Sequence, residues 1–122
     1  MSANLRTVLG ALLLELVAGG CAHPVTAAPG GSIRVSLAEY RLNPASIRTR
    51  AGVLTLIATN VGRLTHNLVV SRGGVTQATM KPIGPGQSGQ VTVRLAPGTY
   101  LVGSTLLSDE ALGLYGHVTV SR

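Results

Sequence analysis

The chain has 122 residues, with one cysteine, three tyrosines and neither phenylalanine nor tryptophan. Ten basic residues against four acidic ones give a formal net charge of +6. The length fits one domain. A single cysteine excludes an internal disulfide framework, a four-cysteine zinc site and a CxxC redox motif. The lack of phenylalanine and tryptophan argues against an aromatic stacking platform for single-stranded nucleic acid.

The basic residues are dispersed along the chain, and all but Lys81 are arginines. Nucleic-acid-binding proteins usually gather their basic residues along one face or one helix. Single arginines at alternating strand positions are instead typical of solvated sheet faces. We therefore expect no nucleic-acid partner.

Residues 1–21 are typical of an export signal. Arg6 follows a short polar start, and an apolar run from Val8 to Val17 comes next, interrupted by Glu15. The run is too short to span a bilayer, which takes about 20 apolar residues. It suits the apolar region of a signal peptide, and we expect the mature domain to work outside the cytoplasm.

Two cleavage sites compete. The segment Val17-Ala18-Gly19-Gly20-Cys21 resembles a bacterial lipobox, in which the cysteine becomes lipidated and N-terminal, although Ala18 stands where leucine is usual. Val25-Thr26-Ala27, followed by Ala28, suits an ordinary signal peptidase. We favour lipidation at Cys21, which makes the protein a cell-envelope lipoprotein held at the membrane surface. The alternative is a secreted or periplasmic protein.

The residues after the leader predict a linker followed by one domain. Residues 22–32 are small, polar and rich in proline and glycine, which indicates a flexible tether, and His23 in this stretch has no evident role. Residues 33–122 form the predicted domain. Leu, Val and Ile supply 27 of the 91 residues from Ser32 onward, enough for a core without large aromatic residues.

The domain shows apolar residues at every second position, with turn signals every 8–12 residues, which is typical of short β-strands. Turns are expected at Asn43-Pro44, Gly73-Gly74, Pro85-Gly86 and Pro97-Gly98. Between them we expect strands around residues 33–37, 47–50, 54–58, 66–70, 75–80, 91–95, 100–102 and 118–120. About seven or eight such strands predict an all-β antiparallel sandwich.

One helical turn is expected over Ser108–Leu112. Ser108 would cap it, and the carboxylates of Asp109 and Glu110 would lie where the helix dipole favours negative charge.

The ordered motifs of the domain resemble those of the cupredoxins, the small blue-copper proteins. The markers are EYRLNP from Glu39, Asn60-Val61-Gly62 before His66-Asn67-Leu68, Pro85-Gly86, Pro97-Gly98-Thr99-Tyr100, and the stretch Leu112 to Val120. No single marker is specific, but their order is. The resemblance covers nearly the whole domain and implies a Greek-key β-sandwich.

The resemblance also implies a copper site, and the residues depart from it. A blue-copper centre takes two imidazoles, one thiolate and a weak axial thioether. By the family's spacing, His66 matches the upstream histidine. Ser104 stands at the cysteine position, Asp109 at the second histidine and Leu114 at the methionine. With three ligands lost, we expect no type 1 copper and no cofactor.

A different metal site is the alternative. His66, Asp109, Glu110 and His117 could offer nitrogen and oxygen ligands to Cu(II) or Zn(II). Against this, His117 alternates with valines and should face solvent, and the two acids suit a helix start. His66 alone is more often a hydrogen-bonded structural residue than a ligand.

No enzyme signature is present. Ser104 and Ser108 lack a GxSxG context, and only three acidic residues follow the leader, which leaves little for acid–base chemistry. The sequence predicts an exported, copper-free cupredoxin-like domain that acts as a binding or structural module with an unknown envelope partner. The alternative function is copper binding or electron transfer through a non-standard site around His66.

Overall fold

The alternation of apolar and polar residues produces strands with one buried face. In the strand Ser32–Ala38, Ile33, Val35 and Leu37 are buried, and the residues between them are exposed or partly exposed. The computed structural model of the chain describes residues 23–28 and 30–122. Within these residues it contains ten strands and one short helix, α2. The elements are β1 (Val25–Thr26), β2 (Ser32–Ala38), β3 (Arg41–Asn43), β4 (Ser46–Arg50), β5 (Gly52–Asn60), β6 (His66–Arg72), β7 (Val75–Ile83), β8 (Ser88–Leu95), β9 (Gly98–Gly103), α2 (Asp109–Leu112) and β10 (Tyr115–Ser121).

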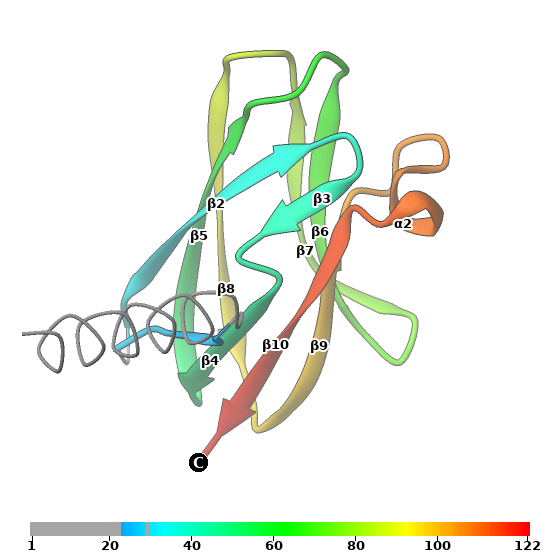
Figure 1. Ribbon diagram of the computed structural model, residues 1–122. Helices are drawn as coiled ribbons and strands as arrows, with labels where there is room; N and C mark the ends of the chain where they lie inside the picture. The colour runs from blue at the N-terminus through cyan, green and yellow to red at the C-terminus, as the bar shows by residue number, and fades with distance from the viewer. Residues whose placement is uncertain (1–22, 29) are drawn as a thin grey trace, which may run out of the picture.

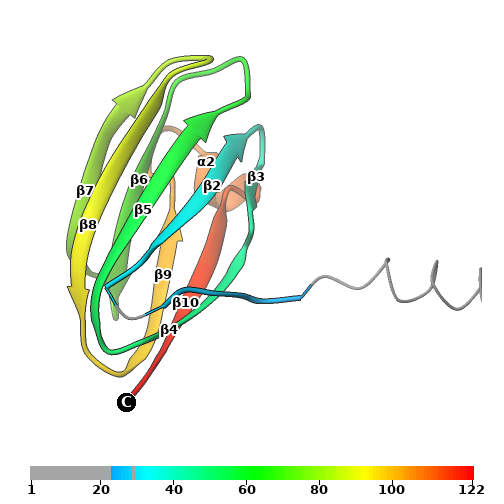
Figure 2. The same ribbon diagram turned by 90° about the vertical axis from the view of Figure 1, so that its left-hand side faces the viewer.

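The strands form two sheets packed face to face (Figures 1 and 2). One sheet has the order β1-β4-β10-β9-β6-β7, and the other has the order β3-β2-β5-β8. The β2–β5 pair is parallel, as are β1–β4 and β4–β10. This confirms the all-β sandwich, while the sheets are mixed and the strands number ten, not seven or eight.

Aliphatic side chains from both sheets fill the interior. Leu54 and Leu56 of β5 are fully buried, as are Leu68 of β6 and Val118 of β10. Removing one such side chain from water stabilises the fold by roughly 1.5–3 kcal/mol. The core therefore needs no phenylalanine or tryptophan.

The structure differs from the predicted tether at Val25–Ala27. Val25 and Thr26 pair with Ile47 and Arg48 of β4, and Ala27 is buried and donates its N–H to the carbonyl of Arg48. Pairing with β4 gives the backbone N–H and C=O groups of this segment hydrogen-bond partners. Amino-acid composition alone does not predict such pairing. The predicted signal segment, including Cys21, lies outside the described residues.

The loops at one end of the sandwich converge on a single region. They are residues 39–40 after β2, 61–65 after β5, and 104–114 between β9 and β10, which carry α2 (Figure 1). We call this the site end. His66 is the first residue of β6, and this start of the strand lies at the site end.

Candidate functional site

His66 lies at the centre of the site end. Its side chain is fully buried, and both ring nitrogens meet carboxylates. Nδ1 lies 2.7 Å from Oδ2 of Asp109, and Nε2 lies 2.8 Å from Oε1 of Glu39. The two contacts join three segments that are far apart in sequence, and they occupy both ring nitrogens.

Asp109 connects the histidine to Ser104. It is the first residue of α2 and is buried, with its Oδ2 accepting a hydrogen bond from the Ser104 hydroxyl at 2.7 Å. Ser108 is the N-cap residue of this helix, as expected, but its side chain makes no capping hydrogen bond. The Asp109 carboxylate binds His66 and Ser104 because these buried polar groups need partners.

Ser104 is itself held on its other side by Asn67. The hydroxyl oxygen accepts a hydrogen bond from the Asn67 backbone N–H at 3.3 Å and lies 3.1 Å from the Asn67 Oδ1. That same Oδ1 accepts from the backbone N–H of Thr105 at 2.8 Å. Asn67 therefore couples the start of β6 to the end of β9.

Glu39 is held by backbone donors as well as by His66. The N–H of Arg63 lies 2.9 Å from its Oε1, and the N–H of Leu64 lies 2.7 Å from the same atom. These two backbone donors, with a smaller contribution from His66, lower the pKa of Glu39 from 4.5 to about 2, and partial burial opposes the shift. Glu39 is therefore ionised at neutral pH, and the Nε2–H of His66 donates to it.

The motif Asn60-Val61-Gly62 shapes the loop that receives Glu39. Asn60 is fully buried; its Nδ2 donates to the carbonyls of Leu64 and Ile83, and its Oδ1 accepts from the N–H of Gly62. A Cβ at position 62 would lie 2.5 Å from each oxygen of the Glu39 carboxylate. The motif thus presents two backbone N–H groups and leaves room for the carboxylate.

The side chains of Glu39, His66, Asn67, Ser104 and Asp109 form one hydrogen-bonded polar cluster. Among the described residues, no buried side-chain nitrogen or oxygen lacks a partner. A buried network of this kind is stable only when every member is satisfied, and this one is.

The other candidate residues lie apart from the cluster. Leu114 is fully buried in the core, with an aliphatic side chain that offers no donor. His117 is exposed on β10, as expected, and packs edge-on against Tyr115 with ring centroids 5.9 Å apart. Glu110 shares no hydrogen bond or ion pair with His66 in the described part of the chain, and His23 is exposed.

The cluster therefore brings together His66, Asp109 and Ser104, but not Glu110 or His117. Glu39 and Asn67 are members that the sequence reasoning missed. Glu39 had one available signal, because it is one of only three acidic residues after the leader. No group of three or more His, Cys, Asp and Glu side chains arranged to hold a metal ion is found among residues 23–28 and 30–122.

Comparisons with known proteins relate the fold to blue copper proteins. No family model matches the chain, and no curated protein matches it. Among solved structures, reduced auracyanin from Roseiflexus castenholzii is 23% identical, with a TM-score of 0.69, over 75% of this chain and 97% of that one. Auracyanin A, a "blue" copper protein from Chloroflexus aurantiacus, is 19% identical, with a TM-score of 0.67, over 81% and 100%.

Auracyanin B is 24% identical, with a TM-score of 0.68, over 82% of this chain and 91% of that one. At this level of sequence identity, similarity to a solved structure supports a shared fold only. The chain has a cupredoxin-like domain, as the sequence motifs predicted. Within the described residues, no helix is long and apolar enough to cross a membrane.

Proposed function

We propose that this protein is an exported cupredoxin-like domain in which the polar cluster replaces a type 1 copper centre, and that it acts as a binding or structural module of the cell envelope. The observation that carries the proposal is the pair of carboxylates on His66: Asp109 at Nδ1 and Glu39 at Nε2. A histidine with both nitrogens engaged has none free for a metal.

The residues present do not fit a type 1 copper site. Such a site needs a thiolate and a weak thioether beside two imidazoles. At the positions that match the cysteine and methionine, this chain has the Ser104 hydroxyl, which is bonded to Asp109, and the aliphatic Leu114. The second imidazole position is taken by Asp109, which acts as an acceptor within the cluster.

The cluster also does not support hydrolytic chemistry. A serine nucleophile needs an adjacent base, usually a histidine, within hydrogen-bond reach. Here Asp109 stands between Ser104 and His66, and the serine is fully buried. These contacts favour a structural role over an enzymatic one.

The anchor proposed for the protein is a lipid on Cys21. Cleavage before Cys21 would keep β1 and the buried Ala27 in the mature chain, whereas cleavage after Ala27 would remove both. Cleavage before Cys21 is favoured because it retains the hydrogen-bonded strand β1 and the buried Ala27. We expect Cys21→Ala to reduce membrane association, and the mass of the mature N-terminus to distinguish the two cleavages; unchanged membrane association would overturn the anchor.

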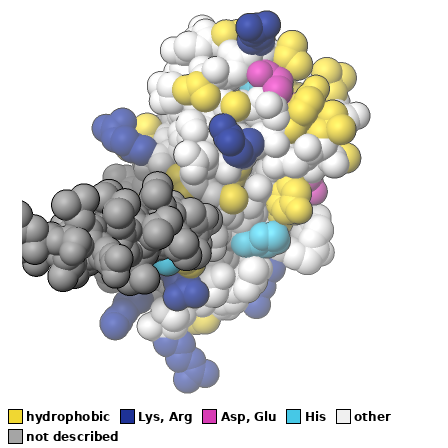
Figure 3. All heavy atoms as spheres, viewed as in Figure 1, with side chains coloured by type: hydrophobic (Ala, Val, Ile, Leu, Met, Phe, Trp, Pro, Cys, Tyr) yellow, Lys and Arg dark blue, Asp and Glu magenta, His cyan; other side chains and the backbone are white. Residues whose placement is uncertain are grey.

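The site end offers an apolar surface for a protein partner. Of the eight large hydrophobic residues that are exposed in the described part of the chain, six lie in its loops or at their borders: Tyr40, Val61, Leu64, Leu107, Leu112 and Tyr115. Yellow side chains gather there in the space-filling view (Figure 3). An apolar patch rimmed by polar residues is typical of a protein-interaction site.

The alternative function is copper binding or electron transfer through a non-standard site at His66. The observation that favours it is the supply of nitrogen and oxygen donors from His66, Asp109 and Glu39 in one place, since Cu(II) and Zn(II) accept such ligands. Against it, the two carboxylates lie on opposite edges of the ring and cannot share one ion at one ring nitrogen.

Metal titration separates the two functions. The purified protein is titrated with Cu(II) and then Zn(II), with binding followed by calorimetry and visible absorption. We expect no intense blue band and no stoichiometric tight binding. The matched controls are His66→Ala and His117→Ala, the second at an exposed histidine. Tight binding that His66→Ala abolishes and His117→Ala retains would overturn the proposal in favour of the alternative.

A further inference from the structure

Charge is divided unequally between the two ends of the sandwich. All three acidic residues of the described chain, Glu39, Asp109 and Glu110, lie at the site end. The opposite end carries arginines. Arg50 pairs in register with Ser121, which precedes Arg122. Gly52 pairs with Leu95, which follows Arg94. The described part of the chain has no acidic side chain at that end. Figure 3 shows magenta side chains only in the upper part of the molecule, whereas dark blue ones lie in both parts, including around the lower end of β4.

We infer that the exposed face of β4 beside β1, carrying Arg48 and Arg50, docks the domain on an anionic lipid surface. We call it the β4 basic face. This inference rests on the proposed export and membrane anchoring. It identifies the surface of the domain that contacts the bilayer and the charge of the lipids that this surface binds.

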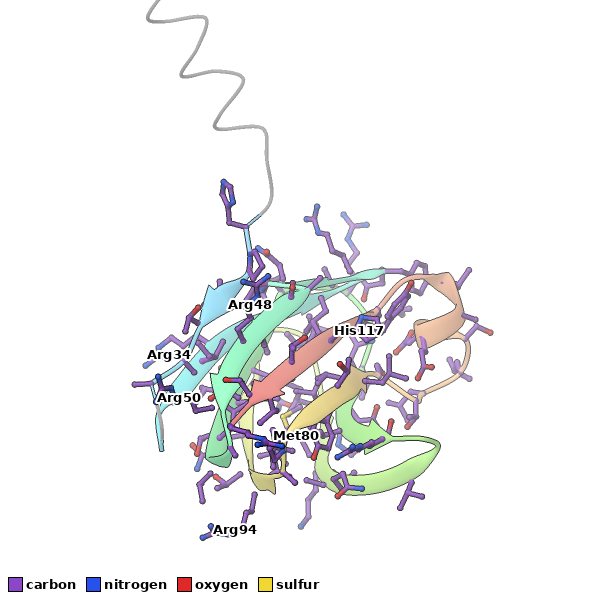
Figure 4. All side chains as sticks on the ribbon, turned by 90° about the horizontal axis from the view of Figure 1, so that it is seen from below. Arg34, Arg48, Arg50, Met80, Arg94 and His117 are labelled. Carbon is purple, nitrogen blue, oxygen red and sulfur yellow. The ribbon has the colours of Figure 1, made fainter. Side chains whose placement is uncertain are left out.

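Arg48 and Arg50 are free to make that contact. They alternate with the buried Ile47 and Thr49, so both point outward from the sheet. Neither side chain takes part in a hydrogen bond or ion pair within residues 23–28 and 30–122. Together with Thr26, Ala28 and Ser121 they line an open hollow where β1 runs along β4. Figure 4 shows Arg34 on the same side of the molecule as Arg48 and Arg50, while Arg94 lies farther away.

The length of chain between Cys21 and β1 favours a membrane as the occupant. Val25 lies four positions after Cys21, and four steps along the chain span at most about 14 Å even when fully extended. A lipid on Cys21 would therefore hold β1, and with it Arg48, the partner of Thr26, close to the lipid headgroups.

Electrostatics supply the binding strength. Each arginine near an anionic leaflet strengthens binding about fivefold, and the effect falls off within a Debye length. A basic face adds electrostatic attraction to anionic lipids to whatever affinity the lipid anchor supplies. Removing Arg48 and Arg50 together should then weaken vesicle binding about 25-fold.

The test uses the chain from Ala22 to Arg122 without lipid, which contains every described strand, with folding verified by a cooperative thermal transition. Sedimentation with vesicles of phosphatidylcholine and phosphatidylglycerol at 7:3, and with pure phosphatidylcholine, gives the affinities at low and high salt. The variant is Arg48→Gln/Arg50→Gln. The matched control is Arg41→Gln/Arg63→Gln, which removes the same charge from the site end.

We expect binding to the anionic vesicles only, weakened by salt, lost in the β4 variant and largely kept in the control. Equal loss in both variants would overturn the proposal, because net charge alone would then account for the binding. No binding by the unchanged chain, or equal binding to neutral vesicles, would also overturn it. The assay contains neither the lipidated Cys21 nor a metal, so its failure is distinct from a failure of the anchor or of the copper-free assignment.

Discussion

The carboxylate of Glu39 fills the space next to Gly62, where a Cβ would lie 2.5 Å from each of its oxygens. The glycine is therefore part of the site and not only of a turn. Because its φ angle is not in the left-handed region, close approach is the reason for glycine here. The same loop supplies the two backbone N–H groups, from Arg63 and Leu64, that bind the carboxylate.

Gly62→Ala is expected to force Glu39 out of the cluster and to lower the free energy of unfolding by about 1–3 kcal/mol, the range for a substitution that breaks a polar network. Urea unfolding measures the change. Gly84→Ala is the control, because the nearest atom to its Cβ is the flexible end of Gln87 at 3.3 Å. In a Glu39→Ala background, Gly62→Ala should cost much less; an equal cost in both backgrounds would contradict the steric relationship.

Glu39 should give the fold a specific dependence on acid pH. Its pKa is about 2 in the folded protein and 4.5 as the ordinary value, so the folded state binds fewer protons than the unfolded state between these values. The stability it contributes is complete above about pH 4.5 and is lost as the pH falls towards 2. Thermal unfolding across this range should show a decline that is shallower in Glu39→Gln.

The control for that experiment is Glu110→Gln, which changes an acid at the same end that makes no side-chain hydrogen bond in the described chain. Its pH profile should follow that of the unchanged protein. A Glu39→Gln profile as steep as the original would mean that other carboxylates carry the acid sensitivity.

Asp109 and Glu110 are adjacent acids with opposite surroundings, which makes them a matched pair. Asp109 is buried and bonded to His66 and Ser104, whereas Glu110 is partly exposed. Asp109→Ala should lower the free energy of unfolding by roughly 3–5 kcal/mol, because it leaves a buried partner unpaired. Glu110→Ala should change it by less than about 0.5 kcal/mol. Similar losses in urea unfolding would show that the cluster contributes no specific stability.

The sequence predicted the sandwich because strand alternation and turn residues are local signals, and β2 follows its pattern at every position. It also identified His66, Ser104 and Asp109 one by one, through family spacing. The same spacing implies that His66 and Asp109 lie near one another, but it did not predict a direct hydrogen bond between them, since the helix-start pattern offered a local explanation for Asp109. Glu39 lies 27 positions from His66, and no periodicity connects a loop acid to a distant strand start.

The assignment of Ser104, Asp109 and Leu114 to lost ligand positions predicts that a copper site can be rebuilt. The triple variant Ser104→Cys/Asp109→His/Leu114→Met supplies a thiolate, a second imidazole and a thioether, and it removes the Asp109 carboxylate from the Nδ1 of His66. We expect this variant to bind Cu(II) with the intense blue absorption of a cysteine-ligated type 1 centre. Leu114→Met alone should stay colourless.

Two controls make the result decisive. Adding His66→Ala to the triple variant should abolish the blue band, because it removes the one ligand that the chain has retained. Circular dichroism verifies that each variant is folded, so a colourless variant is not simply an unfolded one. A folded triple variant that binds Cu(II) without blue colour would show that the ligand positions are assigned wrongly. One that turns blue even with His66→Ala would place the fourth ligand elsewhere in the chain.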